Sequence, residues 1–317
     1  MRAVMRCRCR RMCVLGARRS RLRAAPGDDV AWPLGGSRPV VGGRFLDFVL
    51  VAWLDVGSVR DDRVQALREV AEFSAIAFGV TGLLHGSLAA SRRPSSLDEN
   101  VPALLYTAGL AGPTLAAIVV EQRHRGRTGV GALLGSAQSG TLSWGRVTAA
   151  VGAQPLMMIA AAGLSGRRVR VTRVDPLLAI GQLWVVAGEE FGWRGFAWPR
   201  LAQRFGPVRA TLALATLWGL WHVPMFFVAK SPQAEDSPLR FGSAILAWSF
   251  LHTLLQSDDP SVAIAMMFHA ASNLSLQALD TDTERPSTAL VVVYAGVAAA
   301  CASIIALRRR RSQTCPR

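Results

Sequence analysis

Residues 289–307 read ALVVVYAGVAAACASIIAL, and the next four residues, 308–311, are all arginine. An uncharged run of this length can cross the apolar layer of a membrane as a helix. Arginines that directly follow such a run favour the cytoplasmic side. We therefore predict a final membrane-spanning helix that ends in a basic cytoplasmic tail at 308–317.

The rest of the chain repeats this pattern of apolar runs and charged connectors. Only 18% of the 317 residues are charged, which is low for a soluble domain. Further apolar runs cover 71–90, 101–120, 147–164, 176–198, 208–228, 241–255 and 262–279, with a shorter run at 45–56 and a probable kink at Gly112-Pro113. The pattern predicts an all-α polytopic protein of the cell membrane, a bundle of about eight transmembrane helices over residues 44–307.

Residues 1–43 differ from the rest because they are rich in Arg, Gly and Pro and have no apolar period. We expect a disordered leader there. Its cysteines, Cys7, Cys9 and Cys13, have loose metal-site spacing but no downstream Cys or His cluster, which favours the leader over a metal site.

The net charge of +15 bears on the partners of the chain. Its arginines flank the apolar runs, so lipid headgroups and cytoplasmic loops explain the charge better than nucleic acid does. We expect the lipid bilayer as a partner and no nucleic acid.

Polar residues inside apolar helices are costly and usually face the interior of a bundle. Here they form three groups, which are Glu189, Glu190 and Arg194 in the run 176–198, His222 in 208–228, and His269 with Asn273 in 262–279.

The spacing within the first group predicts different surroundings for its two carboxylates. Glu190 and Arg194 are four residues apart, so on a helix they share a face and can form an ion pair. Glu189 is rotated by about 100° from Glu190 and has no such partner. A buried carboxylate without a cation can act as a general base near neutral pH.

The second and third groups add imidazole and amide side chains. His269 and Asn273 are also four residues apart and suit either an oxyanion or a metal. Glu189, His222 and His269 together match a common zinc ligand set, so zinc or another divalent metal is one possibility and a metal-free Glu/His mechanism is the other. The chain has no HExxH helix of the kind found in zinc proteases.

Taken in order, these motifs resemble the CPBP family of intramembrane metalloproteases, also called the Abi or CAAX prenyl protease 2 family. The EExxxR motif matches Glu189–Arg194, and HxxxN matches His269–Asn273. The FxxxH motif matches residues 218–222 with Trp218 in place of phenylalanine, a difference expected to affect local packing only. The resemblance covers roughly residues 100–280.

The resemblance implies an intramembrane endopeptidase with a role for each polar residue. Glu189 would activate the attacking water with help from His222. His269 and Asn273 would bind the oxyanion or a metal, while Glu190 and Arg194 would orient the site. Eukaryotic members remove the last three residues of prenylated CAAX proteins, and bacterial members are often linked to bacteriocin immunity. The implied substrate is therefore a peptide or protein that can carry a lipid.

Two other functions remain open from the sequence. The chain could be a non-catalytic membrane immunity or scaffold protein, or a transporter that uses Glu189 and His222 as a proton relay. We expect His85 and His252 to be structural, and the tryptophans to serve as packing and membrane-interface anchors.

Overall fold

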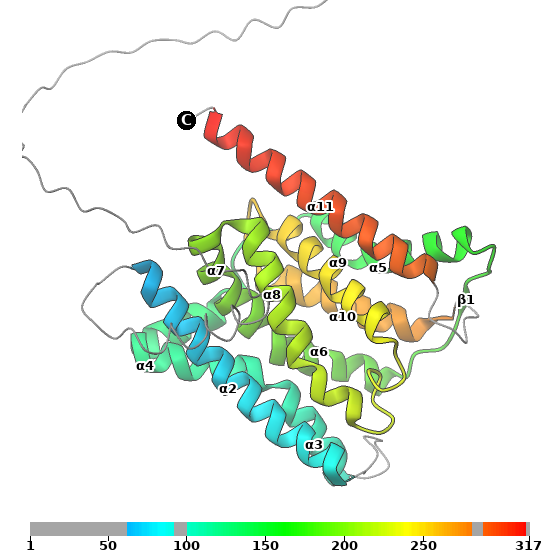
Figure 1. Ribbon diagram of the computed structural model, residues 1–317, viewed down its shortest axis with the longest axis horizontal. Coiled ribbons are helices and arrows are strands. Elements are labelled where there is room, and N and C mark those ends of the chain that lie inside the picture. The colour runs from blue at the N-terminus through cyan, green and yellow to red at the C-terminus, as the bar shows by residue number, and fades with distance from the viewer. Residues whose placement is uncertain (1–61, 92–99, 281–287, 315–317) are drawn as a thin grey trace, which may run out of the picture. The chain divides into compact units, whose positions relative to one another are not determined.

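The computed structural model describes residues 62–91, 100–280 and 288–314 of the chain. The leader expected at 1–43 and the short apolar run at 45–56 lie outside these residues, as does the end of the tail, 315–317. Most of the described residues form helices (Figure 1).

The helices follow one another along the chain, with two very short strands between them. In chain order the elements are α2 (Asp62–Ser91), α3 (Asn100–Leu110), α4 (Gly112–Gly135), α5 (Trp144–Leu164), β1 (Arg170–Val171), α6 (Pro176–Glu190), the π-helix η1 (Phe191–Ala197), α7 (Trp198–Phe205), α8 (Pro207–Trp221), the 3₁₀-helix η2 (Val223–Phe227), α9 (Pro238–Gln256), α10 (Val262–Ala278), β2 (Leu279–Asp280) and α11 (Thr288–Thr314). The strands pair antiparallel, with Arg170 opposite Asp280. Apart from this two-residue ladder, all regular secondary structure of the described residues is helical, which confirms the predicted all-α class.

Four segments are long and apolar enough to cross a membrane singly, and these are Val64–Ser91, Trp144–Leu164, Pro207–Phe227 and Thr288–Arg311. A fifth span results if α3 and α4, which are bent by 46° relative to each other, count as one. The chain is a multi-pass membrane protein, and these four or five segments among the described residues agree with the predicted all-α membrane bundle. The helices α6 and α10 have 15 and 17 residues and carry the polar residues singled out in the sequence.

The bend between α3 and α4 lies at the predicted Gly112-Pro113 kink. The first helix ends at Leu110 and the second begins at Gly112. Pro113 occupies the first turn of α4, where a missing N–H costs no helical hydrogen bond. The local sequence therefore accounts for both the position and the cause of the bend.

A buried network of charges joins α2, α4 and α7. Arg200 on α7 donates hydrogen bonds to Glu69 on α2 at 2.8 Å and to Glu121 on α4 at 2.7 Å. Arg125 donates to the same two carboxylates, at 2.8 Å and 3.2 Å. Both glutamates are buried, and two arginines balance their charges. The network attaches α7, which directly follows η1, to α2 and α4.

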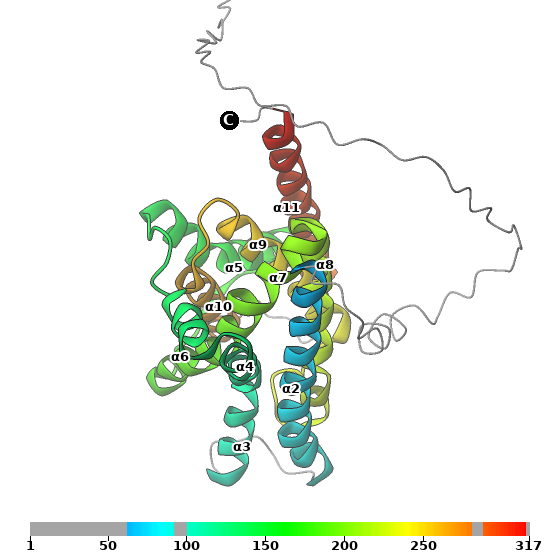
Figure 2. The same ribbon diagram turned by 90° about the vertical axis from the view of Figure 1, so that its left-hand side faces the viewer.

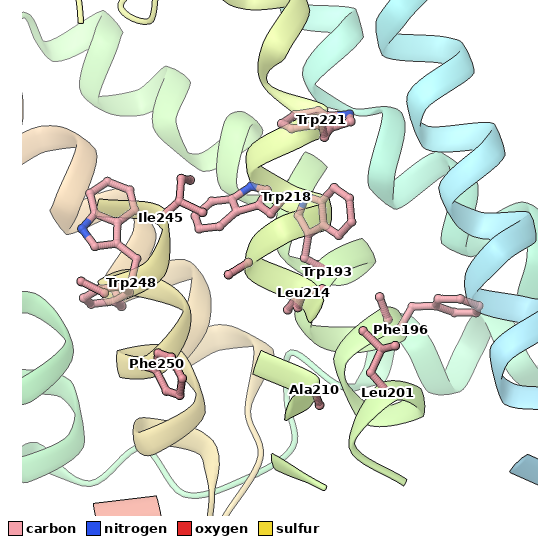
Figure 3. Close-up of a cluster of buried hydrophobic side chains, with 14 of the residues drawn as sticks. Trp193, Phe196, Leu201, Ala210, Leu214, Trp218, Trp221, Ile245, Trp248 and Phe250 are labelled. Atoms are coloured by element: carbon pink, nitrogen blue, oxygen red, sulfur yellow. The ribbon is translucent and has the colours of Figure 1, made fainter. Parts of the chain in front are cut away.

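The other helices pack around a core rich in tryptophan. The α8 helix packs against α7 and α9, and α11 lies along α9 and α5 (Figure 1). The C-terminal end of α11 extends beyond the other helices (Figure 2). Trp218 and Trp221 on α8 meet Trp193 from η1 and Trp248 from α9 in the interior (Figure 3). These four indoles confirm the packing role expected for tryptophan.

Candidate active site

The candidate site lies where α6 changes into a π-helix. Glu189 and Glu190 are the last two residues of α6, and η1 begins at Phe191. Short π-helical segments are rare and often occur at functional sites.

Two glycines let this junction approach the bend between α3 and α4. A Cβ atom on Gly188 would lie 2.9 Å from the carbonyl oxygen of Leu110, and one on Gly192 would lie 2.5 Å from the carbonyl group of Pro113. Both distances are too short for any residue with a side chain. Close backbone packing therefore holds the glutamate pair in place.

Glu190 is the charge-paired member of the two glutamates. Its Oε1 accepts a 3.1 Å hydrogen bond from Nη1 of Arg194, which confirms the pair predicted from their spacing. The same oxygen lies 2.7 Å from Nδ1 of His269 on α10. An ionised carboxylate can only accept, so Nδ1 of His269 carries a proton and Nε2 keeps a lone pair in the neutral ring.

Glu189 has a different environment. Its Oε2 accepts a 2.8 Å hydrogen bond from Nε1 of Trp218, and its side chain is buried. No cation among the described residues lies within ion-pair distance of this carboxylate. The two adjacent glutamates are therefore both buried, but only Glu190 is charge-paired, as the sequence predicted.

His222 follows the last residue of α8. Its Nδ1 lies 2.7 Å from the carbonyl oxygen of Trp218, and a carbonyl oxygen only accepts, so this nitrogen donates. The ring is buried and packs edge-to-face against Trp221 and Phe241, with centroid distances of 4.7 Å and 4.9 Å. Nε2 of His222 is consequently the nitrogen left with a lone pair.

Asn273 is held by a residue that the sequence did not single out. Its Nδ2 donates a 2.8 Å hydrogen bond to Oε1 of Gln182, which lies two turns before Glu189 on α6. Together with the contact between Glu190 and His269, this bond joins α6 to α10 through polar side chains. The HxxxN residues therefore face the helix that carries the glutamate pair.

The aromatic ring of Trp218 connects these groups. Its centroid lies 5.5 Å from that of His269 and 5.6 Å from that of His222. The guanidinium carbon of Arg194 lies 4.1 Å from the same ring. The structure thus places Glu189, Arg194, His222 and His269 against one indole, and Glu190 joins them through Arg194 and His269. Asn273 lies one turn beyond His269 on α10.

The metal set predicted from the sequence, Glu189, His222 and His269, fits zinc in its chemistry but not in its arrangement here. Each imidazole keeps a free Nε2, which is a normal zinc ligand. However, no group of three or more His, Cys, Asp or Glu side chains within the described ranges is placed to hold a metal ion. The metal assignment stays a prediction.

His252 lies closer to the site than the sequence predicted. Its Nε2 is 4.0 Å from Oε1 of Glu190, and its ring packs edge-to-face against Phe268 with a centroid distance of 4.7 Å. Neither ring nitrogen has a hydrogen-bond partner among the described residues. A histidine inside an apolar helix was the available signal, as it was for His222. By contrast, His85 hydrogen-bonds the carbonyl oxygen of Tyr106 at 2.8 Å, which fits the structural role expected for it.

Comparison with known proteins gives a match over this region. Residues 174–275 match the family model described as type II CAAX prenyl endopeptidase, Rce1-like. A CAAX prenyl protease 2 of Methanococcus maripaludis is 32% identical over 116 residues, which are 34% of this chain and 43% of the relative. Over this segment the chain is similar to the CPBP family. The three CPBP motifs and all six predicted site residues fall inside the matched segment.

The CPBP match does not extend over the whole of either protein. It spans less than half the length of the curated relative. The helices outside residues 174–275, including α2, α5 and α11, lie beyond the family match. The shared region is therefore the part of the chain that carries the glutamate pair and its partners.

Proposed function

We propose that the chain is an intramembrane endopeptidase of the CAAX prenyl protease 2 type. Its substrate would be a membrane-associated peptide or protein, which can carry a lipid. The observation that supports this best is the difference between the adjacent glutamates, because Glu190 is paired with Arg194 and His269 while Glu189 lacks a cation. Hydrolysis needs one carboxylate free to take a proton, and a rigid frame around it.

In the proposed first step, Glu189 takes a proton from water as the water oxygen attacks the scissile carbonyl carbon. Trp218 holds Oε2, so Oε1 is the oxygen that receives the proton. His222 assists through Nε2, the nitrogen that its own backbone contact leaves free. The new C–O bond turns the carbonyl oxygen into an oxyanion.

The oxyanion is stabilised from α10. His269 donates to it through Nε2 in the form with a proton on each ring nitrogen, the second proton being taken up from solvent before the attack, while Glu190 accepts from Nδ1. Asn273 can donate with the amide hydrogen that Gln182 does not use. When the C–N bond breaks, the proton held by Glu189 passes to the leaving amine.

The test is cleavage of a peptide library by the purified protein in detergent. Wild-type protein should produce fragments, and Glu189→Ala should not. Glu235→Gln, which changes an exposed carboxylate outside the three motifs, should cleave like wild type. Metal analysis of the same wild-type, Glu189→Ala and His222→Ala preparations tests the metal assignment, because losing a ligand should lower the bound metal.

The two alternatives give different results. A non-catalytic immunity or scaffold protein would yield no fragments, and its Glu189→Ala variant would still complement a deletion strain. A proton-coupled transporter would yield no fragments but would move a solute into liposomes in a way that depends on Glu189 and His222. Either result would contradict the protease proposal.

A further inference from the structure

The tryptophan at position 218, which replaces the phenylalanine of the family motif, forms a hydrogen bond within the candidate site. Phenylalanine is the motif residue at this position, and an indole differs from it by carrying an N–H donor. From the sequence we expected this change to affect packing only. In the structure the indole Nε1 donates a 2.8 Å hydrogen bond to Oε2 of Glu189, and phenylalanine could not make that bond.

The backbone of the same residue holds a second group. The carbonyl oxygen of Trp218 accepts a 2.7 Å hydrogen bond from Nδ1 of His222. One residue therefore contacts both the carboxylate and the imidazole that the proposed mechanism uses on water. These contacts leave Oε1 of Glu189 and Nε2 of His222 without a hydrogen bond to the described part of the chain.

Packing restricts the indole from several sides. The ring is almost completely buried, the guanidinium carbon of Arg194 lies 4.1 Å from its centroid, and the ring of His269 packs on it edge-to-face at 5.5 Å. Aromatic and cation–π contacts of this kind have preferred geometries. The ring cannot turn its N–H away from Glu189 without losing them.

We infer that Trp218 is a positioning residue, which holds Glu189 through its indole N–H and His222 through its carbonyl so that both face one water molecule. This inference rests on the proposed function. It predicts that the N–H group matters to the rate of cleavage beyond the shape of the ring.

The experiment tests the contribution of the indole N–H group independently of the shape of the ring. Trp218 is replaced by phenylalanine and, site-specifically, by 3-benzothienylalanine, whose ring keeps the shape of indole but has sulfur in place of N–H. Loss of a hydrogen bond that orients a reacting carboxylate should lower kcat by about 10- to 100-fold in both variants. KM should change little, because substrate contacts stay the same. Trp144→Phe, at an indole that is 85% exposed, is the matched control and should keep wild-type kcat.

The kinetic and stability results for the Trp218 variants either support or contradict its positioning role. Wild-type kcat in the benzothienyl variant would overturn the inference, as would a loss of thermal stability in place of a loss of kcat. If wild-type protein cleaves no peptide, the proposed function fails. The hydrogen bond from Trp218 to Glu189 can still be measured directly in that case. The ultraviolet resonance Raman band that reports indole N–H bonding should shift between wild type and Glu189→Ala, and an unchanged band would also overturn the inference.

Discussion

Nδ1 of His269 lies 2.7 Å from Oε1 of Glu190, the same oxygen that accepts a hydrogen bond from Arg194. The second glutamate of the EExxxR motif thus contacts the histidine of the HxxxN motif directly. Glu190 links α6, η1 and α10, and its contact with Nδ1 leaves Nε2 as the nitrogen of His269 with a lone pair. Its role is wider than the ion pair that the sequence predicted.

Replacing Glu190 should damage both folding and activity. Glu190→Gln leaves the buried guanidinium of Arg194 without its counter-charge and weakens the bond to His269. Breaking one side of a buried ion pair typically costs about 3–5 kcal/mol. Thermal unfolding in detergent should show this loss, and cleavage assays on the remaining folded protein should show reduced activity. A variant that is fully stable and yet inactive would instead assign direct chemistry to Glu190.

Replacing Glu189 should affect activity alone. Glu189→Gln keeps an oxygen that can accept the N–H of Trp218, and no cation is left unpaired. Loss of a general base typically lowers the rate by about 10²- to 10⁴-fold. We expect kcat to fall by this amount with an unfolding temperature near that of wild type. Substantial activity in this variant would remove Glu189 from the mechanism.

Gln182 should matter to activity through Asn273. Gln182→Ala removes the acceptor that orients the Asn273 amide and should lower kcat by about tenfold, the equivalent of one modest hydrogen bond. Gln277→Ala, which changes an exposed glutamine on α10, serves as the control. The effect should largely vanish when Asn273→Ala is already present. Full additivity of the two substitutions would show that Gln182 acts elsewhere.

The buried imidazole of His252 should lower the stability of the folded wild-type protein. Both of its ring nitrogens are buried without partners in the described chain, and an unsatisfied buried polar group costs about 1–3 kcal/mol. His252→Leu should therefore leave the unfolding temperature unchanged or raise it. Thr253→Val is a useful comparison, because it removes a buried hydroxyl that does have a partner, Thr211, at 2.6 Å, and should be destabilising. A large loss of stability in His252→Leu would show that the imidazole is satisfied in the folded protein.

The charge network around Arg200 should stabilise the attachment of α7. Arg200→Met leaves the buried carboxylates of Glu69 and Glu121 with Arg125 as their shared partner. We expect a loss of about 3–5 kcal/mol, measured by thermal unfolding in detergent. Arg204→Met, on the same short helix but more exposed, should cost less. Equal effects at both positions would contradict the role of the network.

Much of the fold was predictable from local sequence. The apolar runs located the helices because a run long enough to cross a membrane has few other stable structures. The Gly112-Pro113 kink followed from the chemistry of proline. Among the described residues, four or five segments are long and apolar enough to cross a membrane, while α6 and α10 carry the polar residues of the site.

The sequence by itself determined the helical class, the three motifs and the pairing of Glu190 with Arg194, because these depend on residues close together in the chain. Only the tertiary structure decided that Trp218 donates to Glu189, that Glu190 contacts His269 and that Gln182 holds Asn273. Those bonds join residues on different helices, and helix periodicity says which face a side chain occupies but not which helix it meets. The packing of α6 against α10 and the approach of Trp218 on α8 to Glu189 supplied that information.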